Sequence, residues 1–148
     1  MASAVLDTTV LVSALLNPNP GGVSNDLLRF AKEGVFDLLL SDDLLEETAA
    51  TLNKDHLRDQ YGYSEADVVG YCKDLALIGT VLSDVPELRG IVRDPNDDMV
   101  VACAVAGDAG YIVTRDKDLL SLGAYERITM ITPEEFLQVL RNPAPPGS

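Results

Sequence analysis

The fold of this chain is decided by residues 4–16, AVLDTTVLVSALL. Residues 4–6 form a short apolar run that predicts a buried strand, and Asp7 follows it directly. Residues 8–16 then repeat apolar side chains with helical spacing, so a helix is expected immediately after the acid. The stretch therefore predicts a strand, an acid and a helix in that order.

The same alternation continues along the chain. Turn-type and cap residues such as Ser41, Asp94 and Thr132 precede several of the later helical segments. No hairpin signal joins the expected strands, so the pattern predicts an α/β fold with a mainly parallel sheet of about five strands, covered on both faces. Further strands are expected at 36–40, 80–82, 111–114 and 128–131, and further helices at 24–32, 41–52, 64–78, 95–106, 117–120 and after 132.

The length and composition indicate one globular domain. The chain has 148 residues, 47% of them hydrophobic and 24% charged, which is enough apolar surface for a core. We expect the domain to span residues 1–141 and the Pro-rich residues 142–148 to form a disordered tail. No apolar run approaches the roughly 18 residues of a membrane helix, and no basic leader precedes the first strand, so a cytoplasmic location is expected.

The charge balance opposes nucleic-acid binding at first sight. Eleven Lys and Arg against 24 Asp and Glu give a net charge of −13, and phosphates are ordinarily bound by basic side chains. His56 is the only histidine, and Cys72 and Cys103 are isolated, which excludes a His-rich zinc site and gives no support to a disulfide framework. Any chemistry must therefore come from carboxylates.

Several acids fall where strands of a parallel sheet end. Asp7 follows the first strand, Glu47 lies on the helix after the second, and Asp116 follows the fourth. Asp94, Asp97 and Asp98 open the helix before the fourth strand and can face the same edge. A cluster of carboxylates repels itself unless a cation or protons neutralise it, and oxygen ligands suit Mg²⁺ or Mn²⁺. The sequence therefore predicts a hard-metal site that could hydrolyse a phosphodiester.

Other acids in these regions have simpler interpretations. Asp42 and Asp43 fit first-turn acids that offset a helix dipole, and Glu46 fits a solvated helix residue. Asp94 fits a helix cap, and Asp118 fits a residue that faces solvent.

The chain contains four motifs, which are VLDT at 5–8, LLEE at 44–47, DPNDD at 94–98 and IVTRDKDLL at 112–120. Together they resemble the PIN domain family. They occur in the family's order, and the similarity extends over residues 4 to about 138. The nearest resemblance is to the toxin components of toxin–antitoxin pairs related to VapC-type ribonucleases. The resemblance implies a three-layer α/β/α sandwich and a Mg²⁺- or Mn²⁺-dependent endoribonuclease with an RNA substrate, often dimeric and restrained by a cognate antitoxin.

The resemblance also assigns the metal-binding and catalytic acids. The family's first, second and last acids correspond to Asp7, Glu47 and Asp116. Its third corresponds to Asp97 or to Asp98, and the motif alone leaves both open. One residue departs from the family pattern, because Thr9 stands where the family usually has an asparagine that supports the first acid.

Four further residues are candidates for substrate binding. Arg93, Arg115 and Lys117 adjoin the acids and could bind phosphates or only compensate neighbouring carboxylates. The hydroxyl of Thr114 could orient a water or an acid, or be structural. The alternative to a ribonuclease is a catalytically inactive PIN-fold binding module, for which Thr9 is the main support.

Overall fold

The computed structural model describes residues 1–18 and 22–142. The Pro-rich tail expected at 142–148 lies outside the described residues apart from Asn142. None of the helices in the described part of the chain combines the length and apolar character needed to cross a membrane.

The sheet has six strands in the order β3-β2-β1-β4-β6-β5. All neighbouring strands are parallel except β5 and β6, which confirms the predicted, mainly parallel α/β sheet. The strands are β1 (Ser3–Leu6), β2 (Asp37–Ser41), β3 (Thr80–Leu82), β4 (Tyr111–Val113), β5 (Ala124–Tyr125) and β6 (Ile128–Ile131).

The sixth strand, β5, had no signal in the sequence. It pairs with β6 through a two-residue connection, Glu126 and Arg127, and Glu126 has a positive φ of 53°. Tight hairpins usually place Gly, Asn or Asp at such positions, so Glu-Arg gives no hairpin signal. The strand adds an antiparallel edge and leaves the parallel centre unchanged.

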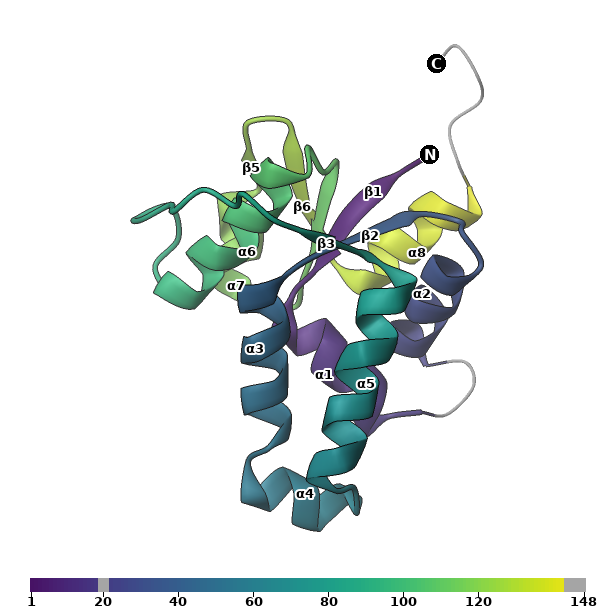
Figure 1. The fold of residues 1–148 in the computed structure, drawn as a ribbon. Coiled ribbons are helices and arrows are strands. Elements are labelled where there is room, and N and C mark those ends of the chain that lie inside the picture. The colour runs from purple at the N-terminus through teal and green to yellow at the C-terminus, as the bar shows by residue number, and fades with distance from the viewer. Residues whose placement is uncertain (19–21, 143–148) are drawn as a thin grey trace.

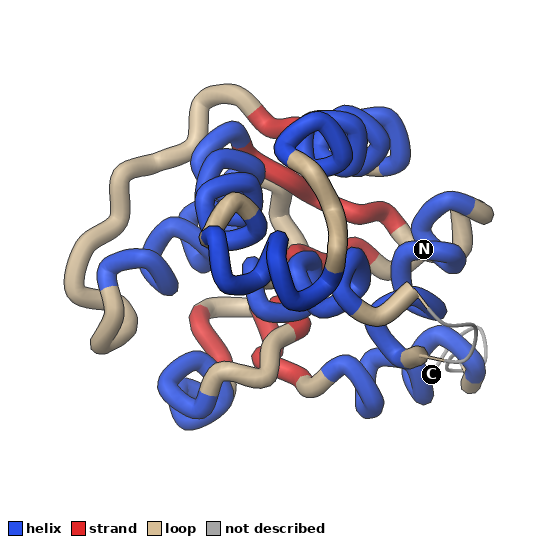
Figure 2. Tube along the Cα trace, turned by 90° about the horizontal axis from the view of Figure 1, so that it is seen from below, coloured by secondary structure: helices blue, strands red, loops and turns tan. Residues whose placement is uncertain are grey.

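Helices cover both faces of the sheet. Helix α6 packs against β1, β2 and β4, and helices α2 and α8 contact each other. Figure 1 shows α6 on one side of the strands and α2 and α8 on the other. Figure 2 likewise shows helices on either side of the strands, as expected for a three-layer sandwich. The helices are α1 (Thr8–Leu16), α2 (Val23–Lys32), α3 (Asp42–Leu52), α4 (Asp55–Tyr61), α5 (Glu65–Ile78), α6 (Pro95–Ala106), α7 (Lys117–Leu122) and α8 (Pro133–Arg141).

The predicted helix caps are present. The Ser41 hydroxyl accepts the N–H of Leu44, and Thr132 forms a capping box with Glu135. Helices α3 and α5 pack together, and α4 joins them at the end farthest from the sheet (Figure 1). These caps fix where each helix leaves the sheet, and so fix the positions of the acids in the first helical turns.

The core lies between the sheet and its helices. Residues 4–6 of β1 are fully buried, as expected for a central parallel strand with both faces covered. Cys103 is buried and Cys72 is half-buried, and both are free thiols. Burial on both sides makes β1 a rigid support for Asp7, the next residue.

Candidate active site

A cleft opens where β1 and β4 end, between α1, α3 and α6. Its volume is about 530 Å³. Five acids line the cleft. One follows β1, two lie at the start of α6, one lies on α3 and one follows β4, which agrees with the tendency of ligands to bind at the carboxyl ends of parallel strands. The lining residues are Asp7, Thr8, Thr9, Val12, Ser13, Leu16, Asn17, Glu47, Thr51, Asp94, Asn96, Asp97, Val100 and Asp116.

Asp7 is the most enclosed of these acids, with 3% of its surface exposed. Its Oδ1 accepts a hydrogen bond from Oγ1 of Thr9 at 2.6 Å and another from the N–H of Val10 at 3.2 Å. Burial raises the pKa of Asp7, and hydrogen bonds, above all that from Thr114, partly offset this effect. The carboxylate is thus held in one orientation at the start of α1.

Thr114 links Asp7 to the end of β4. Its fully buried hydroxyl donates to Oδ2 of Asp7 and accepts the backbone N–H of Asp116 at 2.9 Å. Asp116 in turn caps α7. Of the two roles considered for Thr114, orienting an acid is the one that these contacts match.

Asp97 carries the clearest sign of an unmet interaction. Only 8% of its surface is exposed, and its buried Oδ2 has no hydrogen-bond partner among the described residues. Burial, followed by the charges of Asp116, Asp94 and Asp7, raises the pKa of Asp97 to about 7. Burying a carboxylate oxygen without a hydrogen-bond donor costs free energy. We therefore expect a proton or a cation at this oxygen.

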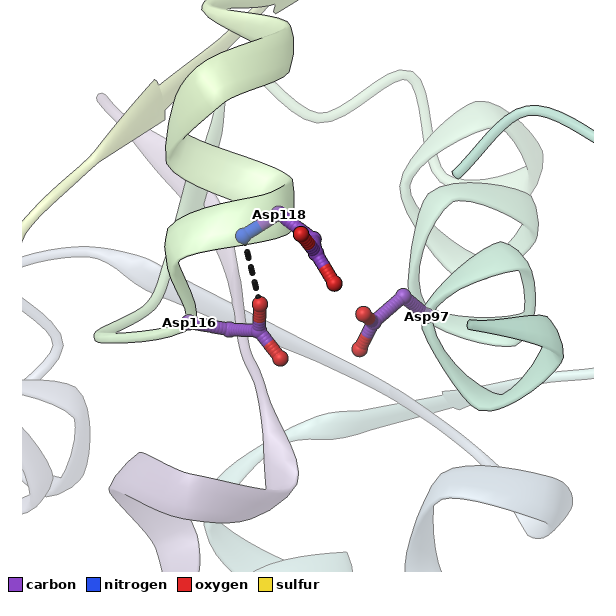
Figure 3. A group of neighbouring side chains, drawn as sticks. All are labelled: Asp97, Asp116 and Asp118. Carbon is purple, nitrogen blue, oxygen red and sulfur yellow. Dashed lines mark hydrogen bonds between the residues drawn. The ribbon is translucent and has the colours of Figure 1, made fainter. Parts of the chain in front are cut away.

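Asp97 lies opposite two acids of α7 and its cap. One carboxylate oxygen each from Asp97, Asp116 and Asp118 lie within 4.8 Å of one another, close enough for a shared metal ion. Figure 3 shows the three side chains converging across the gap between α6 and α7, with the N–H of Asp118 donating to Oδ1 of Asp116 at 2.7 Å. Asp118 is exposed, as expected, yet it belongs to this group. Its spacing of two residues from Asp116 was the signal that could have identified it.

Asp98 does not line this cleft. Its Oδ2 accepts the N–H of Gly90 at 2.9 Å, and its Oδ1 accepts those of Ile91 and Val92 at 3.0 and 2.7 Å. Both oxygens are therefore occupied by the backbone of the segment before α6. Adjacent helical residues point in different directions, which separates Asp98 from Asp97.

Glu47 lies on the α3 wall of the cleft and is half-buried. It is not a member of the close group formed by Asp97, Asp116 and Asp118. Asp94 also lines the cleft, while its Oδ1 caps α6 by accepting the N–H of Asn96 at 2.9 Å. The expected cap is therefore present, and Asp94 also lies at the cleft that the acids of this segment were expected to face.

The three basic candidates lie outside the cleft lining. Arg115 forms a two-pronged ion pair with Glu134 of α8, with both N–O distances at 2.6 Å. Arg93 and Lys117 are exposed. Among the described residues, no basic side chain lines the cleft. Of the two roles considered for Arg115, compensation of a carboxylate is the one observed.

Comparison with known families agrees with this arrangement. A family model described as the PIN domain matches residues 3–118, which include the strand, the acids and the Thr114 link described above. The chain belongs to the PIN domain family. PIN domains are generally nucleases, which hydrolyse nucleic acids.

Two individual proteins are similar to this PIN domain. An uncharacterized protein of Methanocaldococcus jannaschii, MJ1680, is 28% identical over 142 residues, covering 90% of this chain and 88% of the relative. The crystal structure of VapBC2 from Rickettsia felis, bound to a DNA fragment from their promoter, contains a chain with a TM-score of 0.60 and 18% identity. That match covers 88% of this chain and 98% of the other, so the two share a fold.

The departure at Thr9 is resolved by geometry in this PIN domain. The sequence put a hydroxyl where an asparagine was expected to support the first acid. Thr9 Oγ1 donates to Asp7, which is the contact that such a residue would make. The substitution therefore preserves support for Asp7.

The donor set of this PIN domain fits a hard divalent cation. The available ligands are carboxylate oxygens, and one of them, Oδ2 of Asp97, is buried without a partner among the described residues. Mg²⁺ and Mn²⁺ prefer such oxygen ligands, whereas zinc sites usually include His or Cys.

Proposed function

We propose that this protein is a Mg²⁺- or Mn²⁺-dependent endoribonuclease that hydrolyses RNA phosphodiester bonds. The observation that carries the proposal is the buried Oδ2 of Asp97, which has no hydrogen-bond partner in the described part of the chain and lines a cleft together with Asp7, Asp94 and Asp116. In a family of nucleases, such an oxygen is best explained as a metal ligand. The proposal selects Asp97 rather than Asp98, because both oxygens of Asp98 already accept backbone N–H groups.

Three acids would hold the ion most directly, namely Asp97, Asp116 and Asp118. Asp7 and Glu47 would complete the site from the other walls of the cleft. A bound Mg²⁺ or Mn²⁺ would supply Lewis-acid chemistry, activating water for in-line attack and stabilising the departing oxygen.

The residues around the acids have a positioning role in this proposal. Thr9 and Thr114 donate to the two oxygens of Asp7, so its carboxylate needs little reorganisation when a ligand arrives. Thr114 also accepts from the N–H of Asp116, which couples that acid to the same support. The polar contacts of these two threonines therefore serve orientation rather than substrate binding.

Substrate phosphates would reach the site from its rim. Lys117 and Arg93 are exposed and adjoin Asp116 and Asp94 in sequence, so they are the basic residues we propose for RNA contacts. Arg115 would contact RNA only after its ion pair with Glu134 has broken. With a net charge of −13, the contact with RNA should be weak and sensitive to salt.

We also propose that the protein is the toxin of a toxin–antitoxin pair in the cytoplasm and forms a homodimer. Support comes from the four motifs that resemble VapC-type ribonucleases and from a shared fold that covers 98% of the matched chain of the VapBC2 structure. Co-expression with the protein encoded beside it tests this part. Relief of growth inhibition would support it, and growth inhibition that no neighbouring gene relieves would contradict it.

Cleavage assays test the nuclease proposal. RNA and DNA oligonucleotides of the same sequence are incubated with the protein in Mn²⁺, in Mg²⁺ and in excess chelator. We expect internal cuts in RNA alone, with either ion, and none with chelator. Cleavage of DNA at the same rate would contradict the assignment of RNA as the substrate. Cleavage in excess chelator would contradict the dependence on a metal ion.

The alternative is a catalytically inactive binding module. It rested on Thr9, whose hydroxyl makes the supporting contact to Asp7. Calorimetric titration with Mn²⁺ distinguishes the two functions. Heat of binding together with a rise in melting temperature favours the nuclease, and the absence of both favours the binding module.

A further inference from the structure

Residues 83–94, which connect β3 to α6, pack against one side of α6 (Figure 1). Residues 85–88 of this connection line a cavity together with residues of α6. Those residues of α6 lie three and four positions apart, so they share one side of the helix, and they are Pro95, Met99 and Ala102. The cleft is lined by another side of α6, formed by Asn96, Asp97 and Val100. The connection is therefore supported by α6 away from the cleft.

Asp98 holds residues 90–92 of the connection. It lies three residues after Pro95 and four before Ala102, on the side of α6 that the connection covers. Asp98 is 5% exposed, and its carboxylate accepts the backbone N–H groups of residues 90, 91 and 92 at 2.9, 3.0 and 2.7 Å. A carboxylate suits this position because both of its oxygens accept hydrogen bonds and neither donates one. These bonds fix the backbone of the connection directly before Arg93.

Arg93 is the single residue between two anchored positions. On one side, Asp98 accepts the N–H of Val92 at 2.7 Å. On the other side, Asp94 caps α6, because its Oδ1 accepts the N–H of Asn96 at 2.9 Å. Asp94 also lines the cleft, and neighbouring Cα atoms are about 3.8 Å apart. The backbone of Arg93 is thus held at the rim of the cleft.

Arg93 is exposed and forms no ion pair with the residues that the structure describes. Five other arginines do pair with an acid, and they are Arg29, Arg58, Arg89, Arg115 and Arg141. An arginine without such a pair is notable in a chain with a net charge of −13. Because its guanidinium can bind a phosphate without first breaking an ion pair, Arg93 is well suited to contact a substrate beside the cleft.

We infer that Asp98 is a positioning residue that holds Arg93 at the rim of the cleft for contact with a substrate phosphate. The inference rests on the proposed nuclease function and adds a residue that acts through Arg93 without touching the substrate. A connection already fixed to α6 loses little conformational freedom when Arg93 binds. Removing the charge of Asp98 makes the protein less negative, which by itself favours RNA binding. Loss of the positioning contact has the opposite effect, so the two explanations predict changes of opposite sign.

The test measures binding of a fluorescently labelled, single-stranded 2′-O-methyl RNA by anisotropy, with Mg²⁺ present and over a series of KCl concentrations. A gel checks that the RNA stays intact. We expect Arg93→Gln to weaken binding about tenfold, as for the loss of one charge-assisted contact, and Asp98→Asn to weaken it about three- to tenfold. In each variant the plot of log affinity against log salt should be shallower by about 0.7, which corresponds to one phosphate. The double variant should bind as Arg93→Gln does, because Asp98 acts through Arg93.

Three further variants separate positioning from general effects. Arg89→Gln removes the same charge from the same connection, but Arg89 already pairs with Glu87, so RNA affinity should change by less than about twofold. Thr132→Ala removes the cap of α8 and lowers stability without touching the connection, so RNA affinity should be unchanged. Gly90→Ala strains a backbone with a φ of 72°, although an added Cβ would meet no atom within 4 Å. It should reproduce the effect of Asp98→Asn even if that variant folds poorly.

Three results would overturn the inference. They are RNA binding by a folded Asp98→Asn variant as tight as that of the natural protein, losses that add in the double variant, and a loss in Arg89→Gln as large as in Arg93→Gln. RNA cleavage is measured separately, and the losses should appear in KM rather than in kcat. Coupled losses of binding without any cleavage would retain the role of Asp98 and reject the nuclease. Cleavage by the natural protein with uncoupled variants would do the reverse.

Discussion

The hydroxyl of Thr114 donates a hydrogen bond to Oδ2 of Asp7, joining residues that lie 107 positions apart in the sequence. Because Oγ1 of Thr114 also accepts the N–H of Asp116, one buried side chain fixes two acids of the cleft relative to each other. β1 and β4 are adjacent parallel strands, which brings their ends together for this contact.

Replacing Thr114 with valine removes this link and keeps the side-chain volume. We expect Mn²⁺ affinity to fall about 10- to 100-fold, because Asp7 loses an orienting donor. Stability should fall by about 1–3 kcal/mol, because buried polar groups lose their partner. Calorimetry and thermal unfolding measure the two effects. Thr114→Ser is the matched control, and a valine variant that binds Mn²⁺ as tightly as the serine variant would contradict the role assigned to Thr114.

Thr9 should be replaceable by asparagine but not by valine. Asparagine can donate to Oδ1 of Asp7 in place of the hydroxyl, whereas valine cannot. We expect Thr9→Asn to retain Mn²⁺ binding and Thr9→Val to weaken it about tenfold. Equal binding by both variants would show that this hydrogen bond does not support the site.

The stability of the metal-free protein should fall as pH rises from about 4 to about 7. The pKa of Asp97 is about 7 in the folded chain against an ordinary value of 3.8, so the folded state binds more protons in this interval. The stabilisation is therefore fully present below pH 4 and lost as the pH rises through about 7. Melting temperatures across this range measure it. A metal-free melting temperature that climbs from pH 5 to pH 8 would be inconsistent with the buried carboxyl of Asp97.

Substitutions at Asp97 and Asp98 distinguish the proposed metal ligand from an acid with a structural role. Asp97→Asn should abolish Mn²⁺ binding and raise metal-free stability at pH 8, because it removes a buried charge. Asp98→Asn should lower stability by about 1–3 kcal/mol, because its amide faces backbone N–H groups. Its Mn²⁺ affinity should change far less. If Asp98→Asn instead loses Mn²⁺ binding at unchanged stability, the metal acid is Asp98.

The sequence was informative where a local pattern controls the structure. Asp7 could be predicted because it directly follows an apolar strand and begins a helix. The choice between Asp97 and Asp98 could not be predicted, because it depends on how the segment before α6 folds back onto Asp98. Packing of this kind leaves no periodic signal in the sequence.

The most direct test of the central claim is Mn²⁺-dependent cleavage of a mixed RNA pool by the natural protein and by Asp7→Asn. The account predicts cleavage by the natural protein, its loss in excess chelator, and no cleavage by a folded Asp7→Asn variant. Equal cleavage by the variant would show that the acid cluster around Asp7 is not the catalytic site. No cleavage by the natural protein with either ion would show that this PIN domain is not the proposed ribonuclease.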